Sequence, residues 1–275
     1  YGTKAINGAI IITTKSGKAG KVKVDYSGNI TFSEVSRLPN YQTVFGQGWN
    51  GERKLDENGS WGAAFDGKDR VWGRVIDNSQ QVKPYNYEPN GVRDFFELGT
   101  TYQNNISVSG GSDVAKARLS YSNVKADGIY PADVDSYERN VLGLGGDVEF
   151  GRFKFGANLN YINQNGSFVE AGQGLTVYNN LLQMPNDFYI PGFSDYHSKF
   201  NDLDGYFTQY GVVNPYYSLN EDAVKMNRDR WYGSFETNYK INDWSNITYR
   251  FGLDQYSFNL EGWQAIVAPS ATGPN

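Results

Sequence analysis

The sequence predicts an all-β fold: a transmembrane antiparallel β-barrel, of which this chain supplies about seven strands. Seven segments alternate apolar and polar residues with a period of two, as strands with one apolar face do. The links between these segments alternate between short turns and long loops. A transmembrane helix needs about 20 apolar residues, and the chain contains no such run. Strands are therefore the elements expected to cross a membrane.

The first of the seven segments shows the alternation clearly. Val22, Val24 and Tyr26 alternate with Lys23 and Asp25. Successive side chains of a strand point to opposite faces of a sheet, so each segment has one apolar and one polar face. In a barrel the apolar face meets lipid and the polar face meets the lumen. The segments span residues 21–32, 102–109, 115–122, 142–150, 152–161, 231–241 and 246–254.

The lengths of the links predict how these strands are arranged. Short links rich in Gly, Asn and Asp favour tight hairpins and fall at 110–114, 151 and 242–244. The long links are residues 33–101, 126–137 and 163–229. Strict alternation puts the turns at one rim of a barrel and the loops at the other, as in outer-membrane proteins. A β-sandwich would also give period-two strands, but usually shorter ones and without this alternation.

The composition agrees with a barrel and excludes some functions. The chain of 275 residues has 21 tyrosines and 6 tryptophans, whose amphipathic rings suit the two interfaces of a membrane. Its 32 glycines suit turns and bends. The net charge of −5 gives no support to nucleic-acid binding. The chain has no cysteine, which excludes a disulfide framework.

The opening segment, YGTKAINGAIIITTKSG, differs from the seven strands that follow. Gly2 and Gly8 permit tight or positive-φ backbone. Residues 9–14 form an uncharged, β-branched run, which predicts a strand buried on both faces. Residues 15–20 are a polar, glycine-containing link. We therefore expect a separate buried element that is joined flexibly to the first strand of the barrel.

This opening resembles the signature at the end of the plug domain of SusC-type (SusC/RagA) TonB-dependent outer-membrane transporters. The resemblance continues at residues 104–112, where NNISVSGGS is similar to a strand and turn of that family, and at residues 117–129 and 137–140. The long loops carry no specific similarity. The positions of the opening that match the plug motif are Tyr1, Gly2, Ala5, Asn7 and Gly8.

The resemblance implies an organisation and a function. Residues 1–17 would end the plug domain, and residues 18–275 would form the N-terminal part of the barrel, with long extracellular loops at 34–100 and 163–229. The signal peptide, the TonB box and the remaining strands would lie outside this chain. The family implies import of oligosaccharides or peptides across the outer membrane of a Gram-negative bacterium. Its partners would be the TonB complex, outer-membrane lipid and a SusD-like surface lipoprotein that forms a lid. The alternatives are a siderophore-type receptor and a secreted β-rich glycan-binding module.

Catalytic and metal-binding chemistry find little support in the sequence. His197 is the only histidine, so the chain cannot supply a pair of histidine ligands. Residues 143–146 contain three glycines but lack the spacing of a nucleotide-binding turn. Residues 56–60 and 201–205 place oxygen ligands at alternate positions, as the start of a calcium loop does, but the rest of that motif is missing. We expect no catalytic residues, no metal and no cofactor.

The long loops hold the binding candidates. Exposed aromatic faces beside amides and carboxylates can stack on sugar rings or grip a peptide. Many of these rings could instead form small cores within the loops or face a protein partner. The candidates for contact with substrate or partner are Trp49, Trp61, Trp72, Tyr85, Tyr189, Tyr206 and Tyr216.

Overall fold

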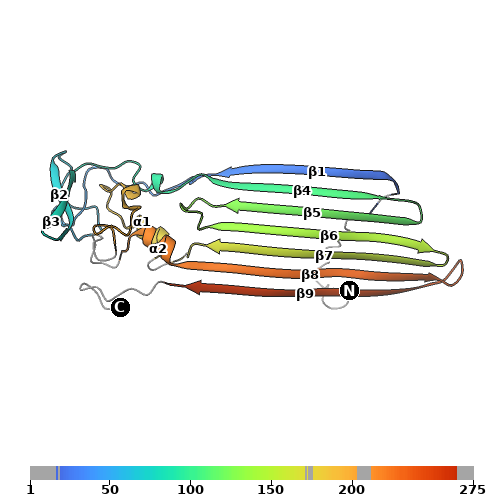
Figure 1. Ribbon diagram of the computed structural model, residues 1–275. Coiled ribbons are helices and arrows are strands. Elements are labelled where there is room, and N and C mark those ends of the chain that lie inside the picture. The colour runs from blue at the N-terminus through green and yellow to red at the C-terminus, as the bar shows by residue number, and fades with distance from the viewer. Residues whose placement is uncertain (1–16, 18, 171, 173–175, 203–211, 265–275) are drawn as a thin grey trace.

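The computed structural model describes residues 17, 19–170, 172, 176–202 and 212–264. Its main feature is one seven-stranded antiparallel sheet, in which each strand lies beside the sheet strand that follows it in the sequence (Figure 1). Strands β2 and β3 form a separate hairpin. The order β1-β4-β5-β6-β7-β8-β9 is the meander that the alternation of link lengths predicts. The strands are β1 (Gly20–Ser33), β4 (Gly99–Gly111), β5 (Ala115–Asp127), β6 (Ser136–Phe150), β7 (Phe153–Phe168), β8 (Ala223–Lys240) and β9 (Asn246–Trp263).

The register aligns the apolar residues of successive strands in rows across the sheet. Paired residues point to the same side, so each row lies on one face. One apolar row contains Val24, Val108, Leu119, Leu144, Leu159, Gly233 and Leu253. We call the side of the sheet that carries this row the apolar face, and the opposite side the polar face. The neighbouring row on the polar face contains Asp25, Ser107, Ser120, Gly143, Asn160, Tyr232 and Asp254.

Short turns and long connections lie at opposite ends of the sheet, as predicted (Figure 1). At the turn end, Gly151 has a φ of 59°, a conformation that glycine adopts without strain. In the next hairpin, the Asn242 side-chain oxygen accepts a hydrogen bond from the Trp244 amide at 3.2 Å. Such local bonds are why Asn is favoured in turns.

The long connections contain structure of their own. The connection after β1 holds a hairpin of β2 (Asp69–Ile76) and β3 (Ser79–Pro84) and the 3₁₀ helix η2 (Arg93–Phe95). Asp77 and Asn78 have φ values of 51° and 58°, which is the two-residue turn that suits the twist of a hairpin. The connection after β7 holds α1 (Val177–Leu182), η3 (Ile190–Phe193) and α2 (Pro215–Glu221). We call residues 34–98, 128–135 and 169–222, where described, the loop lobe.

Three features differ from the sequence expectations or lie outside what the structure describes. Strand β7 continues to Phe168 and strand β8 begins already at Ala223. The second long loop is therefore shorter than the predicted residues 163–229. Within the described residues the sheet does not close into a barrel. The plug-motif residues Tyr1 to Gly8 lie outside the described part of the chain. None of the described helices is long and apolar enough to cross a membrane.

The buried apolar residues of the described chain lie in the loop lobe and not against the sheet. The most completely buried of them are Tyr85, Phe95, Leu181 and Ile190, each at most 1% exposed. On the apolar face of the sheet, by contrast, Leu144 is 49% exposed and Phe251 is 53% exposed. The sheet therefore presents a wide apolar surface that no part of the described chain covers.

Candidate functional site

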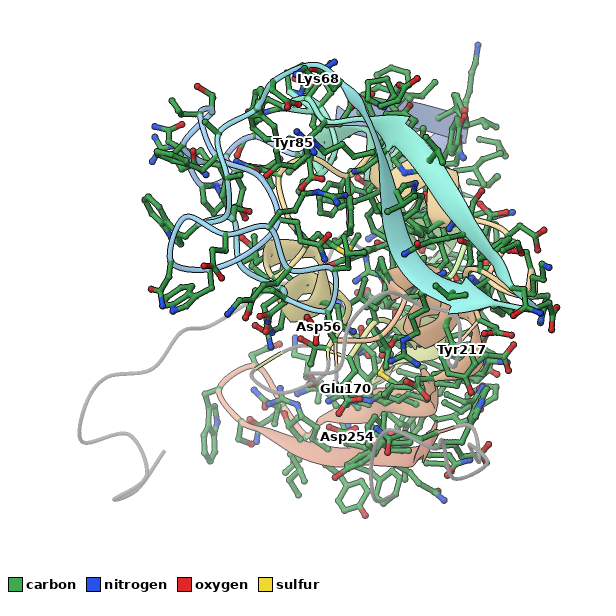
Figure 2. All side chains as sticks on the ribbon, turned by 90° about the vertical axis from the view of Figure 1, so that its left-hand side faces the viewer. Asp56, Lys68, Tyr85, Glu170, Tyr217 and Asp254 are labelled. Carbon is green, nitrogen blue, oxygen red and sulfur yellow. The ribbon has the colours of Figure 1, made fainter. Side chains whose placement is uncertain are left out.

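The loop lobe is held together by a core to which three separate connections contribute (Figure 2, seen from the loop end). Phe95 comes from the first connection, Tyr130 from the short second one and Tyr216 from the third. The Phe95 ring lies 4.9 Å from the Tyr216 ring and 6.4 Å from the Tyr130 ring, both edge-on. Burial raises the pKa of Tyr216 to about 12. These contacts make the three loops one folded unit.

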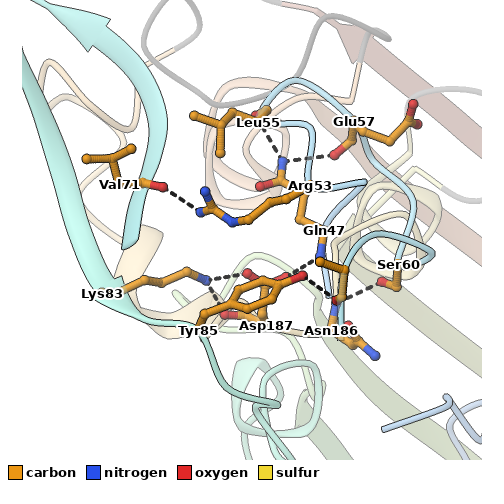
Figure 3. Close-up of polar contacts among 11 residues, drawn as sticks. Gln47, Arg53, Leu55, Glu57, Ser60, Val71, Lys83, Tyr85, Asn186 and Asp187 are labelled. Carbon is orange, nitrogen blue, oxygen red and sulfur yellow. Dashed lines mark hydrogen bonds and ion pairs between the residues drawn. The ribbon is translucent and has the colours of Figure 1, made fainter. Parts of the chain in front are cut away.

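A buried ion pair also joins the first and third connections (Figure 3). The Lys83 ammonium lies 3.0 Å from the Asp187 carboxylate, and the Asp187 side chain is fully buried. Lys83 also donates to the Asp187 backbone carbonyl. The other Asp187 carboxylate oxygen accepts from the Gln47 backbone amide at 2.9 Å. The ammonium lies 3.9 Å from the centroid of the Phe188 ring.

Amide side chains continue this network into the irregular loop at residues 42–64. The Gln47 side chain is fully buried and donates to the Leu55 and Glu57 carbonyls, each at 2.9 Å. Asn186 donates from its side chain to the Gln42 carbonyl at 2.6 Å, and its backbone amide donates to the Ser60 hydroxyl at 3.0 Å. Buried amides with several partners rigidify a loop that lacks regular secondary structure.

Burial changes the protonation of Lys83. Its pKa is lowered from 10.5 to about 8 because the ammonium loses solvent, while the Asp187 carboxylate opposes part of this effect. Glu88 acts in the same direction as Asp187, and Arg53 acts against it. At a pH between the folded-state pKa of about 8 and the unfolded-state pKa of 10.5, Lys83 binds more protons in the unfolded loop than in the folded loop. The stability that depends on Lys83 therefore rises as the pH increases from about 8 to about 10.5.

This linkage gives a testable prediction. We compare the free energy of unfolding of the loop lobe in the wild-type protein with that of Lys83→Met, by urea-dependent protease cleavage of the loops at about pH 7 and about pH 9.5. We expect the wild type to gain stability relative to the variant as the pH rises. The comparison cancels the titration of the tyrosines, which both proteins share. A relative loss of stability over this range would mean that the folded lobe raises the pKa of Lys83.

The structure places the predicted aromatic candidates in two environments. Trp49, Trp61 and Tyr189 are exposed, at 49%, 54% and 47%. Tyr85 and Tyr216 are buried in the lobe, where the Tyr85 hydroxyl donates to the Ala63 carbonyl at 2.8 Å. The half-buried ring of Trp72 packs against Phe188 and Phe193, and Tyr206 lies outside the described residues. The exposed rings can meet a ligand directly, whereas the buried rings support the lobe.

The surroundings of the weaker metal and histidine candidates are described in part. In the part of the chain that the structure describes, no group of three or more His, Cys, Asp and Glu side chains could hold a metal ion. This holds around residues 56–60, and residues 203–205 of the second candidate loop lie outside the description. The His197 ring packs against the Tyr196 ring at 4.2 Å.

The polar face of the sheet carries a hollow of about 460 Å³. Its floor is low because Gly143, Gly145 and Gly156 carry no side chain. In the wall, the Asn158 amide donates to the Ser234 hydroxyl at 2.7 Å. The remaining walls supply charged and polar groups that suit a hydrated ligand: Arg118, Ser120, Asp147, Asn160 and Glu236.

Across β5 to β8 the apolar face ends in a row of aromatic rings on the loop side, whereas on β1 and β4 it continues with Ile30, Phe32 and Tyr102. The row contains Tyr26, Tyr121, Tyr161 and Trp231. The Tyr26 hydroxyl donates to Asn104 at 2.8 Å, and the Tyr121 hydroxyl donates to Asn140 at 2.6 Å. The next row is polar throughout: Gly28, Asn104, Asn123, Asn140, Asn163, Asp229 and Ser257. The aromatic-rich composition predicts such a boundary between apolar and polar rows, but only the strand register shows where the boundary lies.

Gly17, which precedes β1, approaches the sheet closely. Gly17 is buried, and a Cβ added to it would lie 2.7 Å from the Ala117 backbone nitrogen and oxygen. A contact this close to backbone admits only glycine. The last residue of the opening segment therefore lies against β5.

The fold resembles that of known transporter structures. No protein-family profile and no curated protein matches the chain. The structure of a RagAB peptide importer in its closed-closed state matches the whole of this chain with a TM-score of 0.65 at 17% identity. The open-open state of the RagAB peptide importer matches 95% of the chain with a TM-score of 0.62 at 14% identity. The chain spans only 32% and 30% of the length of those chains. It thus shares the fold of part of those proteins.

Proposed function

We propose that this chain is part of an outer-membrane β-barrel that imports oligosaccharides or peptides, with the loop lobe outside the cell. The observation that carries the proposal is the uncovered apolar face of the sheet. A secreted glycan-binding module would bury this face in a core, but the buried apolar residues of the described chain lie in the lobe. Lipid is the environment that suits an apolar strand face with a polar face behind it.

The dimensions of the apolar face fit a bilayer. In β7 the apolar face runs from Phe153, near the turn end, to Tyr161 in the aromatic row. Eight residues of strand rise by about 27 Å. A strand tilt of about 40° reduces this to roughly 20 Å, close to the apolar band of about 25 Å in outer-membrane barrels. Aromatic residues at both limits would form the two interfacial girdles.

The polar face and the loop lobe suit a hydrated solute. The glycine-floored hollow offers Arg118, Asp147 and Glu236 to a ligand in the lumen. Exposed Trp49 and Trp61 offer rings at the loop end. These groups fit transport better than catalysis. The similarity to a peptide importer favours peptides as one class of cargo.

Import of this kind would require two protein partners. A surface lipoprotein would close over the loop lobe as a lid, and the TonB complex would supply energy by remodelling a plug that residues 1–17 complete. The contact of Gly17 with the backbone of β5 supports a link from the plug to β1 that passes along this part of the barrel wall. The edge strands β1 and β9 would pair with further strands, because open edges are not tolerated in lipid.

Growth measurements test the function. We expect deletion of the gene for the full-length protein to abolish growth on one class of polysaccharide or on peptides as the only source of that nutrient, and complementation to restore it. Deletion of the partner lipoprotein should give the same defect. If growth failed only under limiting iron, the siderophore alternative would hold and the import of nutrients would be wrong.

The exposed tryptophans give a more local prediction. We expect Trp49→Ala with Trp61→Ala to lower uptake of the cargo at least tenfold, because large aromatic rings dominate the energy of binding surfaces. Uptake of labelled cargo by cells with equal surface levels of transporter is the measurement. The matched control is Trp244→Ala, since Trp244 is 86% exposed at the turn end. Equal uptake by both variants would exclude the loop tryptophans from binding.

A further inference from the structure

A polar groove lies on the apolar face just beyond the aromatic row. It has a volume of about 490 Å³, within the range of small-ligand sites. Lys125, Glu138, Asn165, Asn227 and Asn259 line it and form one row across β5 to β9. This row lies four residues along each strand from the Tyr121 row, and its side chains point to the same side. The groove therefore opens outward and not into the polar hollow.

The groove is built mainly of amides. The Asn227 amide donates to the Asn165 side-chain oxygen at 2.6 Å, and the Asn165 amide donates to Asn163 at 2.9 Å. Each asparagine has two N–H donors and an oxygen with two lone pairs, so a ladder of single bonds leaves donors and acceptors for a ligand. Such side chains match the alternating donors and acceptors of sugar hydroxyls.

The charges of the groove are balanced. Lys125 pairs in register with Glu138, and Lys225 pairs in register with Glu261. The ammonium of Lys225 lies 4.9 Å from the centroid of the Trp263 ring, which is 44% exposed. A balanced polar groove with an aromatic ring at its edge favours a saccharide over a simple anion.

We propose that this groove binds the saccharide headgroup of a membrane glycolipid. The inference rests on the proposed function, because the apolar face must meet lipid for the groove to lie at headgroup level. Tyrosine and tryptophan rings mark that level in membrane proteins. The row of Leu119, Leu144 and Leu159, on the turn side of the aromatic row, would contact the acyl chains, while the amides would hold the sugars.

The test uses full-length protein in nanodiscs of phosphatidylethanolamine, with and without lipid A, and counts bound lipid A by native mass spectrometry. We expect wild type to retain lipid A preferentially. Asn165→Ala with Asn227→Ala should retain it about tenfold less, the effect of two hydrogen bonds. The matched control, Asn238→Ala with Asn246→Ala, removes a hydrogen-bonded asparagine pair on the polar face outside the hollow and should behave as wild type. Asn259→Ala on β9 provides a second test if the double variant does not fold.

The outcomes separate this inference from the proposed function. Insertion of wild type into nanodiscs without a preference for lipid A would overturn the glycolipid site and leave the membrane barrel intact. Failure of wild type to insert would overturn both. Equal binding of the deacylated, water-soluble headgroup would show a site for free sugars and would also contradict the proposal.

Discussion

Phe235→Arg is expected to destabilise the full-length protein in lipid by about 2–4 kcal/mol, the cost of an arginine near the bilayer midplane on the lipid face of a barrel. Phe235 lies on the apolar face, paired with Ala157 and Phe251, midway between the turn end and the aromatic row. The measurement is unfolding of the protein in lipid vesicles by denaturant. The folded and unfolded fractions are separated by their different mobility in gel electrophoresis of unheated samples.

The neighbouring residue provides a matched control. Ser234 occupies the same strand but points to the polar face, where it lines the hollow. We expect Ser234→Arg to fold and insert with little loss, because its charge would meet water in the lumen. Equal destabilisation by both variants would contradict the assignment of the two faces.

Asp187→Ala is expected to destabilise the loop lobe by about 3–5 kcal/mol, because it leaves the Lys83 ammonium buried without its partner. The Gln47 backbone amide loses its acceptor as well. Since this pair joins the first and third connections, we expect the loops to become sensitive to protease on intact cells while the sheet keeps its stability. Uptake of cargo should fall in parallel.

An exposed ion pair between the same connections serves as the control. Lys199 lies 3.3 Å from Asp77, but the Asp77 side chain is 77% exposed. Exposed pairs contribute little, so Lys199→Ala, which removes the pair without changing the positive-φ turn residue Asp77, should leave the loops resistant to protease. Similar cleavage of both variants would mean that any contact between the loops, and not the buried pair, holds the lobe.

The strands could be predicted because one face of each must be apolar. All seven predicted segments are strands, and their apolar and charged residues lie on opposite faces: for example, Leu119 and Leu159 lie on one face, and Arg118 and Lys154 on the other. The pattern underestimated the lengths of β4 to β9, each of which extends further toward the loop end than its predicted segment. In β7, Asn163, Gln164 and Asn165 make both faces polar beyond the aromatic row, so the alternation vanishes although the strands remain paired. In β9 the alternation reverses, with Tyr256, Phe258 and Leu260 on the polar face.

The loop lobe was less predictable because its packing joins residues far apart in the sequence. The side chain of Tyr85 is buried and that of Trp61 exposed, although each ring occurs in a similar polar, aromatic-rich context. Some local signals were present. Asn214 followed by Pro215 marks the start of α2, where the Asn214 side chain caps the Tyr216 amide. The pairing of Lys83 with Asp187 had no local signal at all.

The most direct test of the account is the environment of successive residues in β7. We would attach spin labels to single cysteines at positions 157 to 160 of the full-length protein in nanodiscs, and measure collisions with oxygen and with a water-soluble nickel chelate. Labels at Ala157 and Leu159 should collide with oxygen, which dissolves in lipid, and labels at Asn158 and Asn160 should not show this preference. If labels at Ala157 and Leu159 met the nickel chelate, or were shielded from both reagents as in a packed core, this face would not lie in a membrane.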